Sequence, residues 1–274
     1  MNWTRIFYHS KQKIKHNFIS VQKIPEFIKQ SGRVPTTFKP FTKEDIYLAH
    51  NPTFVDNILD CNTRNGFGTK DPELNQALMY SNASLWAAVE HCLENNTIAC
   101  SASQGFHHAH FESAGGYCTF NGLVIASIKA LQKIEKVLII DGDAHYGDGT
   151  EDCLNTLKLT DRVINVTRDE IGSSKHRNFS TSDWEFFTSI LLSKHNPSVV
   201  IYQAGADAWD QDPYDAGYLN FESLLKRDAG IFKACKDKGI PLAWNLAGGY
   251  SDPMQKTIDI HLQTLNCSDA CLNS

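Results

Sequence analysis

The sequence has no C-x-x-C pair, although it contains eight cysteines. Zinc ribbons and disulfide frameworks depend on closely and regularly spaced cysteines, so the scattered pattern disfavours both classes. Several of the cysteines stand in apolar surroundings, where a thiol behaves as a small hydrophobic side chain. We therefore expect free thiols and a reducing compartment.

Long hydrophobic runs are also missing. No stretch approaches the roughly 18–20 apolar residues that a membrane-spanning helix needs, and residues 1–9 lack the apolar core of a signal peptide. These absences predict a cytoplasmic protein with no membrane partner. Internal repeats, low-complexity segments and clear domain boundaries are absent too, so we expect residues 1–274 to form a single domain.

A strong charge of either sign is lacking as well. The 26 Lys and Arg residues stand against 31 Asp and Glu residues, which leaves a formal net charge of -5. Attraction to phosphates requires a basic surface, so we expect no direct contact with nucleic acid. The mild acidity would tolerate a cationic substrate without requiring one. Nothing in the sequence indicates an oligomeric state.

Six short apolar runs predict β-strands, and the segments between them carry helical patterns. The strands are expected at residues 5–8, 97–102, 137–140, 162–167, 197–203 and 241–246. Helices are expected to end near residue 32, to open near residues 42 and 52, and to cover residues 72–95, 121–134, 148–157, 181–195, 218–238 and 253–265. The lysines of residues 11–29 are expected on a solvated face, and residues 168–180 are predicted to form a polar loop. Strands that alternate with helices in this way predict an α/β fold with right-handed βαβ units and a parallel sheet.

The run Val137–Ile140 is the centre of this pattern, because it ends in Asp141, Asp143 and His145 at alternate positions. Side chains two residues apart on an extended chain point the same way, so Asp143 and His145 can converge on one point. Carboxylate and imidazole are common ligands of divalent metals. The simpler alternative is an acidic, glycine-rich turn with no ligand.

Three other predicted strands also end in groups that carry chemistry. His107 and His108 follow residues 97–102, Asp207 follows residues 197–203, and Tyr250 follows residues 241–246. Each has a simpler interpretation by itself: packed imidazoles, a turn cap or a packed aromatic ring. Functional groups of open α/β folds gather just past the carboxyl ends of the strands, and four such coincidences on one edge are hard to ascribe to packing.

The residue types together predict metal-assisted hydrolysis of an amide. Asp143, His145 and Asp207 would supply three ligands and leave positions open for water and substrate, as in catalytic zinc sites. The two histidines can serve as base and acid, since imidazole titrates near neutral pH. The remaining groups would support them: Asp141 and Asp148 would each orient one imidazole, and Tyr250 would donate its O–H to an oxyanion.

Several segments resemble those of one enzyme family. GFHHAHFESAGGYCTFNGLVIA is similar to the family's paired-histidine motif with its glycine–aromatic loop, and DGDAHYGDGTE is similar to its metal-binding motif. AGADAWDQDP and LAGGY resemble the segments of the second aspartate ligand and the tyrosine, and LAHNPTFVDNIL and IFYHSKQ resemble upstream segments. From about Ile6 to Ser251, the chain resembles the zinc-dependent histone deacetylase superfamily, which includes bacterial histone deacetylase-like amidohydrolases and acetylpolyamine amidohydrolases.

The resemblance implies a role for each of these residues. The implied zinc ligands are Asp143, His145 and Asp207, although the ligand types alone would also admit Fe2+ or Co2+. His108 would be the general base with Asp148 behind it, His107 with Asp141 an acid or electrostatic partner, and Tyr250 the oxyanion donor.

The resemblance further implies a tunnel, a second ion and a fold. Gly116 and Tyr117 would line a narrow acyl-lysine tunnel. A structural K+ would lie near Asp141, Asp143 and His145, mostly on backbone oxygens, with Thr167 as a further ligand. The implied fold is a single-domain, three-layer arginase-like α/β fold with a mainly parallel eight-stranded sheet.

The chain departs from the family pattern in three places. Tyr146 stands where a histidine or another polar residue is usual, which predicts tuning of the site. Residues 168–180 lack the Gly-Phe-Pro-rich run that many members place opposite the tunnel, so the second tunnel wall is not identified. The chain is also short for the family, which favours trimmed surface loops, a more open groove and a substrate other than a histone.

The function that the sequence favours is the removal of acetyl or other acyl groups from lysine side chains of proteins or from small amines. Within the same chemistry, an acetylpolyamine amidohydrolase is the alternative. An arginase-like ureohydrolase would need a second metal and a carboxylate two residues after His145, where Gly147 stands. A non-catalytic acyl-lysine binding module is the third interpretation, and the presence of every proposed catalytic residue argues against it.

Overall fold

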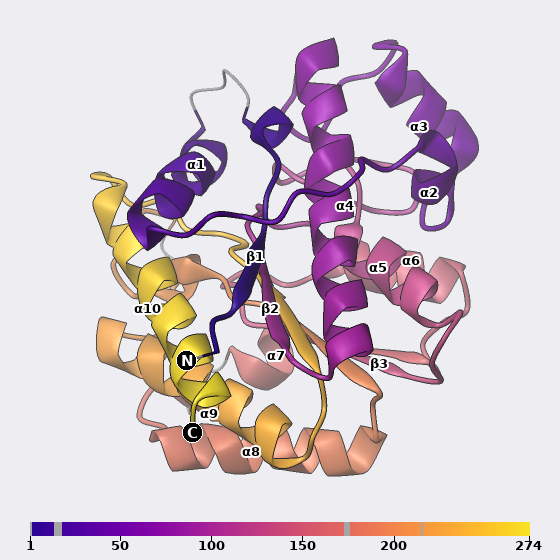
Figure 1. The fold of residues 1–274 in the computed structure, drawn as a ribbon. Coiled ribbons are helices and arrows are strands. Elements are labelled where there is room, and N and C mark those ends of the chain that lie inside the picture. The colour runs from indigo at the N-terminus through magenta and orange to yellow at the C-terminus, as the bar shows by residue number, and fades with distance from the viewer. Residues whose placement is uncertain (1, 14–17, 173–175, 215) are drawn as a thin grey trace.

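The computed structural model describes residues 2–13, 18–172, 176–214 and 216–274 (Figure 1). In these residues six strands form one sheet, in the order β1-β2-β6-β5-β3-β4, and every pair of neighbouring strands is parallel. The strands are β1 (Arg5–Phe7), β2 (Ile98–Ser101), β3 (Val137–Asp141), β4 (Val163–Val166), β5 (Val199–Gln203) and β6 (Leu242–Asn245). The α/β class and the parallel sheet predicted from the alternation of strands and helices are confirmed.

The eight strands that the family resemblance implied are not found in the described residues, where the sheet has six strands. These six are the ones that the apolar runs predicted. The long segments after β2 and β5 are rich in glycine and polar residues and form only isolated bridges, Gly115 with Cys118 and Trp209 with Leu219. Without an apolar run to bury, these segments stay irregular and leave the sheet at six strands.

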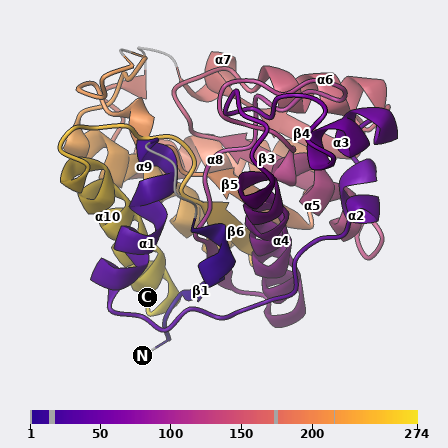
Figure 2. The ribbon, with the colours of Figure 1, turned by 90° about the horizontal axis from the view of Figure 1, so that it is seen from above.

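Helices cover both faces of the sheet and give the molecule three layers (Figure 2). One face packs against α2 (Lys43–Tyr47), α3 (Pro52–Leu59), α4 (Pro72–Asn95), α5 (Gly122–Ala130) and α6 (Asp148–Thr156). The other face packs against α1 (Ile19–Ser31), α7 (Arg168–Ile171), α8 (Thr181–His195), α9 (Phe221–Asp237) and α10 (Gln255–Leu272). The helix α7 lies in the segment predicted as a polar loop, so that prediction is wrong for residues 168–171, and residues 173–175 lie outside the described residues.

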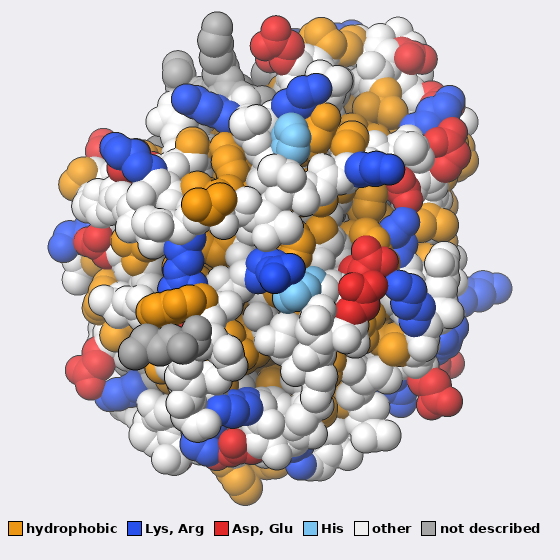
Figure 3. All heavy atoms as spheres, in the orientation of Figure 1, with side chains coloured by type: hydrophobic (Ala, Val, Ile, Leu, Met, Phe, Trp, Pro, Cys, Tyr) orange, Lys and Arg blue, Asp and Glu red, His pale blue; other side chains and the backbone are white. Residues whose placement is uncertain are grey.

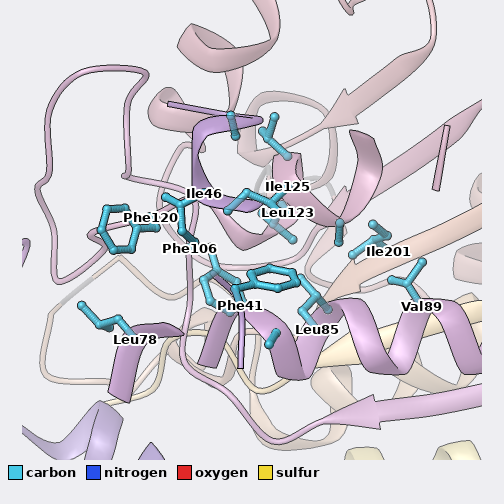
Figure 4. Packing of buried hydrophobic residues seen from close by; sticks show 14 of the residues in the cluster. Phe41, Ile46, Leu78, Leu85, Val89, Phe106, Phe120, Leu123, Ile125 and Ile201 are labelled. Atoms are coloured by element: carbon cyan, nitrogen blue, oxygen red, sulfur yellow. The ribbon is translucent and has the colours of Figure 1, made fainter. Parts of the chain in front are cut away.

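The strands contribute side chains to the cores on both faces of the sheet, because successive side chains point to opposite faces. In β3, Val137 and Ile139 join the core on the α4 side, whereas Leu138 and Ile140 join the core on the α9 side. The cluster on the α4 side is shown in Figure 4 and includes aromatic side chains such as Phe106 and Phe120. A strand buried on both faces therefore reads as a continuous apolar run.

The longest described helix, α4, has clear start and stop signals. The side chain of Asp71 accepts the backbone N–H groups of Glu73 and Leu74, and Pro72 occupies the first turn. The helix ends at Asn96, whose φ of 47° places it in the left-handed region. This helix supports the strands whose carboxyl ends carry the unusual residues.

The four strands that precede the predicted site residues are neighbours in the sheet: β2, β6, β5 and β3. Because all of them run parallel, their carboxyl ends meet at one edge. The fold therefore brings the four strand-end segments together.

No helix among the described residues combines the length and the hydropathy that a membrane span requires. On the face seen in Figure 3, basic and acidic side chains are interspersed, and neither kind forms a continuous patch.

Candidate active site

Three side chains that follow β3 and β5 converge at the carboxyl edge of the sheet. One carboxylate oxygen each of Asp143 and Asp207 and a ring nitrogen of His145 lie within 4.8 Å of one another. The Nδ1 atom of His145 is 3.1 Å from Oδ1 of Asp143 and 3.0 Å from Oδ2 of Asp207. Asp207 comes from the short 3-10 helix η3 (Ala206–Ala208). The structure thus brings together the three residues predicted as metal ligands.

The charges of this cluster fit a divalent cation. Burial, and then the charge of Asp143, raise the pKa of Asp207 to about 7. Burial acts on Asp143 in the same direction, but His107 and the hydrogen bonds with His145 and Asp207 outweigh it and hold the pKa of Asp143 well below its usual range. Hydrogen bonds to both carboxylates raise the pKa of His145 to about 10. A divalent ion would offset the charges of both buried carboxylates and bind the neutral imidazole of His145.

Glycine is required where the chain passes the two carboxylates. A Cβ atom on Gly248 would lie 2.3 Å from Oδ2 of Asp207 and 2.7 Å from Oδ2 of Asp143. The backbone N–H of Gly248 instead donates to Oδ2 of Asp143 at 2.9 Å, and that of Ala144 donates to Oδ1 of Asp207 at 3.2 Å. Such backbone donors fix the orientation of both carboxylates.

His107 forms a buried pair with Asp141. Its Nδ1 atom is 2.7 Å from Oδ2 of Asp141, and its Nε2 atom is 3.6 Å from Oδ1 of Asp143. Burial disfavours a charge on this ring, but the two carboxylates outweigh burial and raise the pKa of His107 to about 9. Asp141 is itself held by the side-chain amide of Gln203, which donates to its Oδ1 at 2.8 Å. These carboxylates therefore favour the protonated form of His107.

His108 forms a second, more open pair with Asp148. Its Nδ1 atom is 2.6 Å from Oδ1 of Asp148. Burial and the charge of His107 lower the pKa of His108, while Asp148 opposes this shift. The centroids of the two imidazole rings are 4.1 Å apart, so a charge on His107 disfavours a charge on His108. Gly116 packs against this ring: its φ is +52°, and a Cβ atom there would lie 2.5 Å from Cδ2 of His108.

Tyr250 stands on the turn that follows β6. Its backbone N–H donates to Oδ2 of Asp212 at 2.8 Å, and its ring is perpendicular to the ring of Tyr214 with centroids 4.6 Å apart. Burial raises the pKa of the Tyr250 hydroxyl well above its usual range, and the charges of Asp207 and Asp143 add to this shift. The charges of both carboxylates of the metal-ligand cluster therefore disfavour ionisation of the hydroxyl, which remains a neutral donor.

Aromatic side chains surround Tyr117, the predicted tunnel residue. Tyr117 is 37% exposed and stacks on Phe18, with ring centroids 3.5 Å apart. Burial, and then the nearby Tyr117 side chain, raise the pKa of Tyr214, which is 50% exposed. Tyr214 thus lies near Tyr117 and is a residue that the sequence did not single out. Its only sequence signal is its place a few residues after Asp207.

Lys23 is a second residue of the site that the sequence missed. Its side chain is 0% exposed, and its Nζ atom donates to the carbonyl oxygens of Ala247 at 2.6 Å and of Gly248 at 2.8 Å. Burial lowers the pKa of Lys23 to about 8, against the attraction of nearby carboxylates. The expectation of a solvated face is wrong for this lysine, which fixes the turn that leads to Tyr250.

Thr167 lies next to Asp141, the first residue of the predicted K+ site. Its Oγ1 atom accepts the backbone N–H of Gly147 at 2.9 Å. A Cβ atom on Gly147 would meet Oδ2 of Asp141 at 2.9 Å and Oγ1 of Thr167 at 3.3 Å. The predicted K+ residues are therefore neighbours, and the ion itself stays a prediction.

Most of the site residues also lie in a segment that matches a known protein family. The model of the histone deacetylase domain matches residues 8–167, which include both His–Asp pairs and the ligands Asp143 and His145. The chain belongs to the histone deacetylase family. The matched region ends before Asp207 and Tyr250, which the fold brings to the same sheet edge.

The relatives of this histone deacetylase family member are distant and longer. Type-1 histone deacetylase 1 of Dictyostelium discoideum is 29% identical over 221 residues, which cover 71% of this chain and 43% of the relative. Histone deacetylase 2 of Oryza sativa subsp. japonica is 29% identical over 199 residues, which cover 63% of this chain and 38% of the relative. The chain thus spans less than half the length of these relatives.

Solved structures show the same fold at low sequence identity. The HDA15 HD domain aligns with a TM-score of 0.78 at 16% identity and covers 98% of this chain and 91% of that chain. An acetylpolyamine aminohydrolase from Burkholderia pseudomallei aligns with a TM-score of 0.73 at 13% identity and covers 96% of this chain and 98% of that chain. The arginase/deacetylase-like fold expected from the sequence is thereby supported, with the sheet of six described strands.

Proposed function

We propose that this protein is a metal-dependent amidohydrolase that removes acetyl or other acyl groups from lysine side chains of proteins or from small amines. The observation that carries the proposal is the convergence of Asp143, His145 and Asp207 on one point. Two His–Asp pairs stand beside this point, in a chain of the histone deacetylase family.

The expected cofactor is Zn2+, and Fe2+ or Co2+ would suit the same donor set. Asp143, His145 and Asp207 would hold it. Bound there, such an ion lowers the pKa of a water molecule and polarises the carbonyl of the amide.

The side chains of the site divide the proton transfers and the charge stabilisation. His108, the neutral imidazole, accepts the proton of the attacking water, and Asp148 stabilises the imidazolium that results. Tyr250 donates its O–H to the oxyanion, while cationic His107 stabilises the same negative charge. When the C–N bond breaks, His108 returns its proton to the leaving amine, and the products are a carboxylic acid and a free amine, which exchange a proton to give a carboxylate and an ammonium ion.

The aromatic residues suit an unbranched chain that leads to the amide. Tyr117 lies near Tyr214, and Gly116 has no side chain that would collide with the ring of His108. Ring faces pack well against methylene groups, as in the side chain of acyl-lysine or a polyamine. An N-acyl amine with a polymethylene chain is therefore the proposed substrate class.

The test is turnover by zinc-loaded protein of a panel that holds acetyl-lysine peptides, longer acyl-lysine peptides and acetylated polyamines. We expect one zinc ion per chain and release of the free amine. In Asp143→Ala, a buried ligand is lost, so metal and activity should disappear together. Asp161→Ala, which alters an exposed carboxylate, is the control and should retain both.

Each competing function gives a different result. Two manganese ions with release of urea from arginine would indicate a ureohydrolase. Binding of acyl-lysine without turnover of any acyl amide would indicate a binding module. Stoichiometric zinc in Asp143→Ala would contradict the ligand assignment.

A further inference from the structure

Asp212 links the two loops that carry Tyr214 and Tyr250, and it belongs to the loop of Tyr214. It is 5% exposed and follows η3 by a few residues. Its two oxygens accept different backbone donors: Oδ2 accepts the N–H of Tyr250 at 2.8 Å, and Oδ1 accepts the N–H of Tyr214 at 3.3 Å. One carboxylate therefore fixes the backbone of both tyrosines.

These two hydrogen bonds differ in kind. The bond to Tyr214 spans two residues and closes a turn within one loop, as aspartate side chains commonly do. The bond to Tyr250 spans 38 residues and joins the segment after β5 to the turn after β6. Local turn chemistry accounts for the first bond and leaves the second unexplained.

Burial of the Asp212 carboxylate lowers the stability of the folded protein because the charge is removed from water. Desolvation raises its pKa, while the hydrogen bonds from the two tyrosine N–H groups and the charge of Lys23 oppose this shift. A buried carboxylate lowers stability unless it is well hydrogen-bonded, and an apolar residue would avoid this cost. The contact with Tyr250 gives the carboxylate a purpose at this position.

The rest of the turn before Tyr250 is already fixed. Lys23 holds the carbonyl oxygens of Ala247 and Gly248, and the N–H of Gly248 donates to Asp143. Asp212 fixes the next part of the turn, at the residue whose ring meets Tyr214 at an interplanar angle of 88°. Loss of this bond would free the Tyr250 side chain and leave the metal-ligand cluster in place.

We propose that Asp212 is a positioning residue, which holds the Tyr250 hydroxyl over the reacting amide by accepting the Tyr250 backbone N–H. The proposal rests on the proposed function, because it assigns to Tyr250 the role of oxyanion donor. Asp212 itself touches no reacting atom. Its effect on turnover therefore passes through Tyr250.

The test uses Asp212→Asn, which keeps the size of the side chain but leaves a single oxygen for two N–H donors. Asp210→Asn, which removes an exposed carboxylate two residues away, is the matched control. We expect Asp212→Asn to lower kcat roughly 10- to 100-fold, as misplacement of a catalytic group does, with KM and zinc content unchanged. In a Tyr250→Phe background the same change should lower kcat less than about 2-fold, since the group that it positions is gone.

A second measurement needs no turnover. With 3-fluorotyrosine introduced at position 250, the wild-type protein and Asp210→Asn should share one narrow fluorine resonance, which Asp212→Asn shifts or broadens. If Asp212→Asn does not fold, Asp212→Glu replaces it: both acceptors remain but are displaced by one methylene group, so the same resonance should shift and kcat should fall.

Two results would overturn the proposal: a variant at position 212 that matches Asp210→Asn in kcat and in the fluorine spectrum, or effects of Asp212→Asn and Tyr250→Phe that multiply independently. If the wild-type protein turns over no acyl amine, the proposed function fails. The fluorine spectrum still decides whether Asp212 positions Tyr250.

Discussion

The neighbouring imidazoles of His107 and His108 have pKa values shifted in opposite directions because their surroundings differ. Two carboxylates outweigh burial at His107 and raise its pKa to about 9. His108 is more open, and burial together with the charge on His107 lowers its pKa. Groups whose pKa values are pushed apart can serve as base and as charge stabiliser at one pH. This asymmetry supports His108 as the proposed general base.

The role of Tyr250 leads to a direct prediction. Tyr250→Phe removes one hydroxyl and leaves the backbone bond to Asp212 intact. We expect kcat to fall by roughly 10²- to 10³-fold, the usual cost of one oxyanion donor, with unchanged zinc content. Steady-state kinetics with an acetyl-lysine peptide and metal analysis of the same samples check this. An unchanged kcat would reject the role of the hydroxyl.

His50 predicts how stability depends on pH. Its Nδ1 atom is 2.9 Å from the carbonyl oxygen of His110, and its Nε2 atom accepts the N–H of Asn121 at 2.8 Å, so the second contact requires a neutral ring. Burial lowers its pKa to about 4. Below a pH of about 6.5 the histidine is protonated in the unfolded chain but stays neutral in the folded chain. The free energy of unfolding therefore falls as the pH drops toward 4, by up to roughly 3 kcal/mol.

The measurement is urea unfolding of wild-type protein and His50→Gln across this pH range. Glutamine does not titrate, so the variant should lose less stability between about pH 7 and 5 than the wild type. The comparison concerns the slope, because His50→Gln also lowers stability at every pH. Equal slopes in the two proteins would show that His50 does not stay neutral.

Single residues were predictable where local geometry governs them. Asp143 and His145 stand at alternate positions after a buried run, and this spacing alone indicates convergence. Lys23 and Asp212 gave no such signal, because their partners lie 225 and 38 residues away. Whether a lysine is solvated or buried beneath a turn depends on which helix the fold places against that turn.

The helices α8 and α9 pack closely against each other at Gly230. A Cβ atom on Gly230 would lie 2.5 Å from Cβ of Trp184 and 2.7 Å from the carbonyl oxygen of Thr181. The larger side chain would therefore force the two helices apart. The metal-ligand cluster lies on loops at the carboxyl edge and is not part of this contact.

We predict that Gly230→Ala lowers the free energy of unfolding by about 1–3 kcal/mol, although alanine is the better helix former. Denaturant unfolding checks the stability, and kcat should stay unchanged. Gly239→Ala is the control, since a Cβ atom there meets nothing within 4 Å and its φ of +65° leaves only backbone strain. A Gly230→Ala protein as stable as the wild type would contradict the close packing.

Most elements were predictable from the sequence, and the failures have a common cause. The strands are buried on both faces, so their apolar runs are continuous and easy to locate. The last helix was expected to end at residue 265 but continues to Leu272. Its final turns are held by Thr4, which directly precedes β1: the Thr4 hydroxyl is 2.6 Å from the Ser268 hydroxyl, and the Thr4 backbone N–H donates to the Asp269 carboxylate at 2.8 Å. Contacts between the two ends of a chain leave no local pattern.

For the whole molecule, the resemblance to the family predicted the fold class correctly but not the number of strands in the sheet. The family implied eight strands, whereas the apolar runs implied the six that the described residues contain. The core is built from both faces of this one sheet. We propose that residues 1–274 form one catalytic domain, because no described layer has a core separate from the sheet.

Metal removal tests this proposal and the metal site together. Zinc that binds only the folded chain stabilises it, so chelation should lower Tm of the wild-type protein. Thermal unfolding should remain a single transition in near- and far-ultraviolet circular dichroism, with and without zinc. Asp143→Ala should have the same Tm in both conditions. Two separated transitions would contradict the single domain. A wild-type Tm that is the same with and without zinc would contradict the binding of zinc to the folded chain.

Anomalous diffraction at the zinc edge, from crystals grown with zinc, tests the metal site most directly. We predict one strong peak at about 2.0–2.2 Å from an oxygen of Asp143, an oxygen of Asp207 and a ring nitrogen of His145. A peak that lies elsewhere, or no peak between these three side chains, would contradict the assignment of the metal centre and the hydrolysis derived from it.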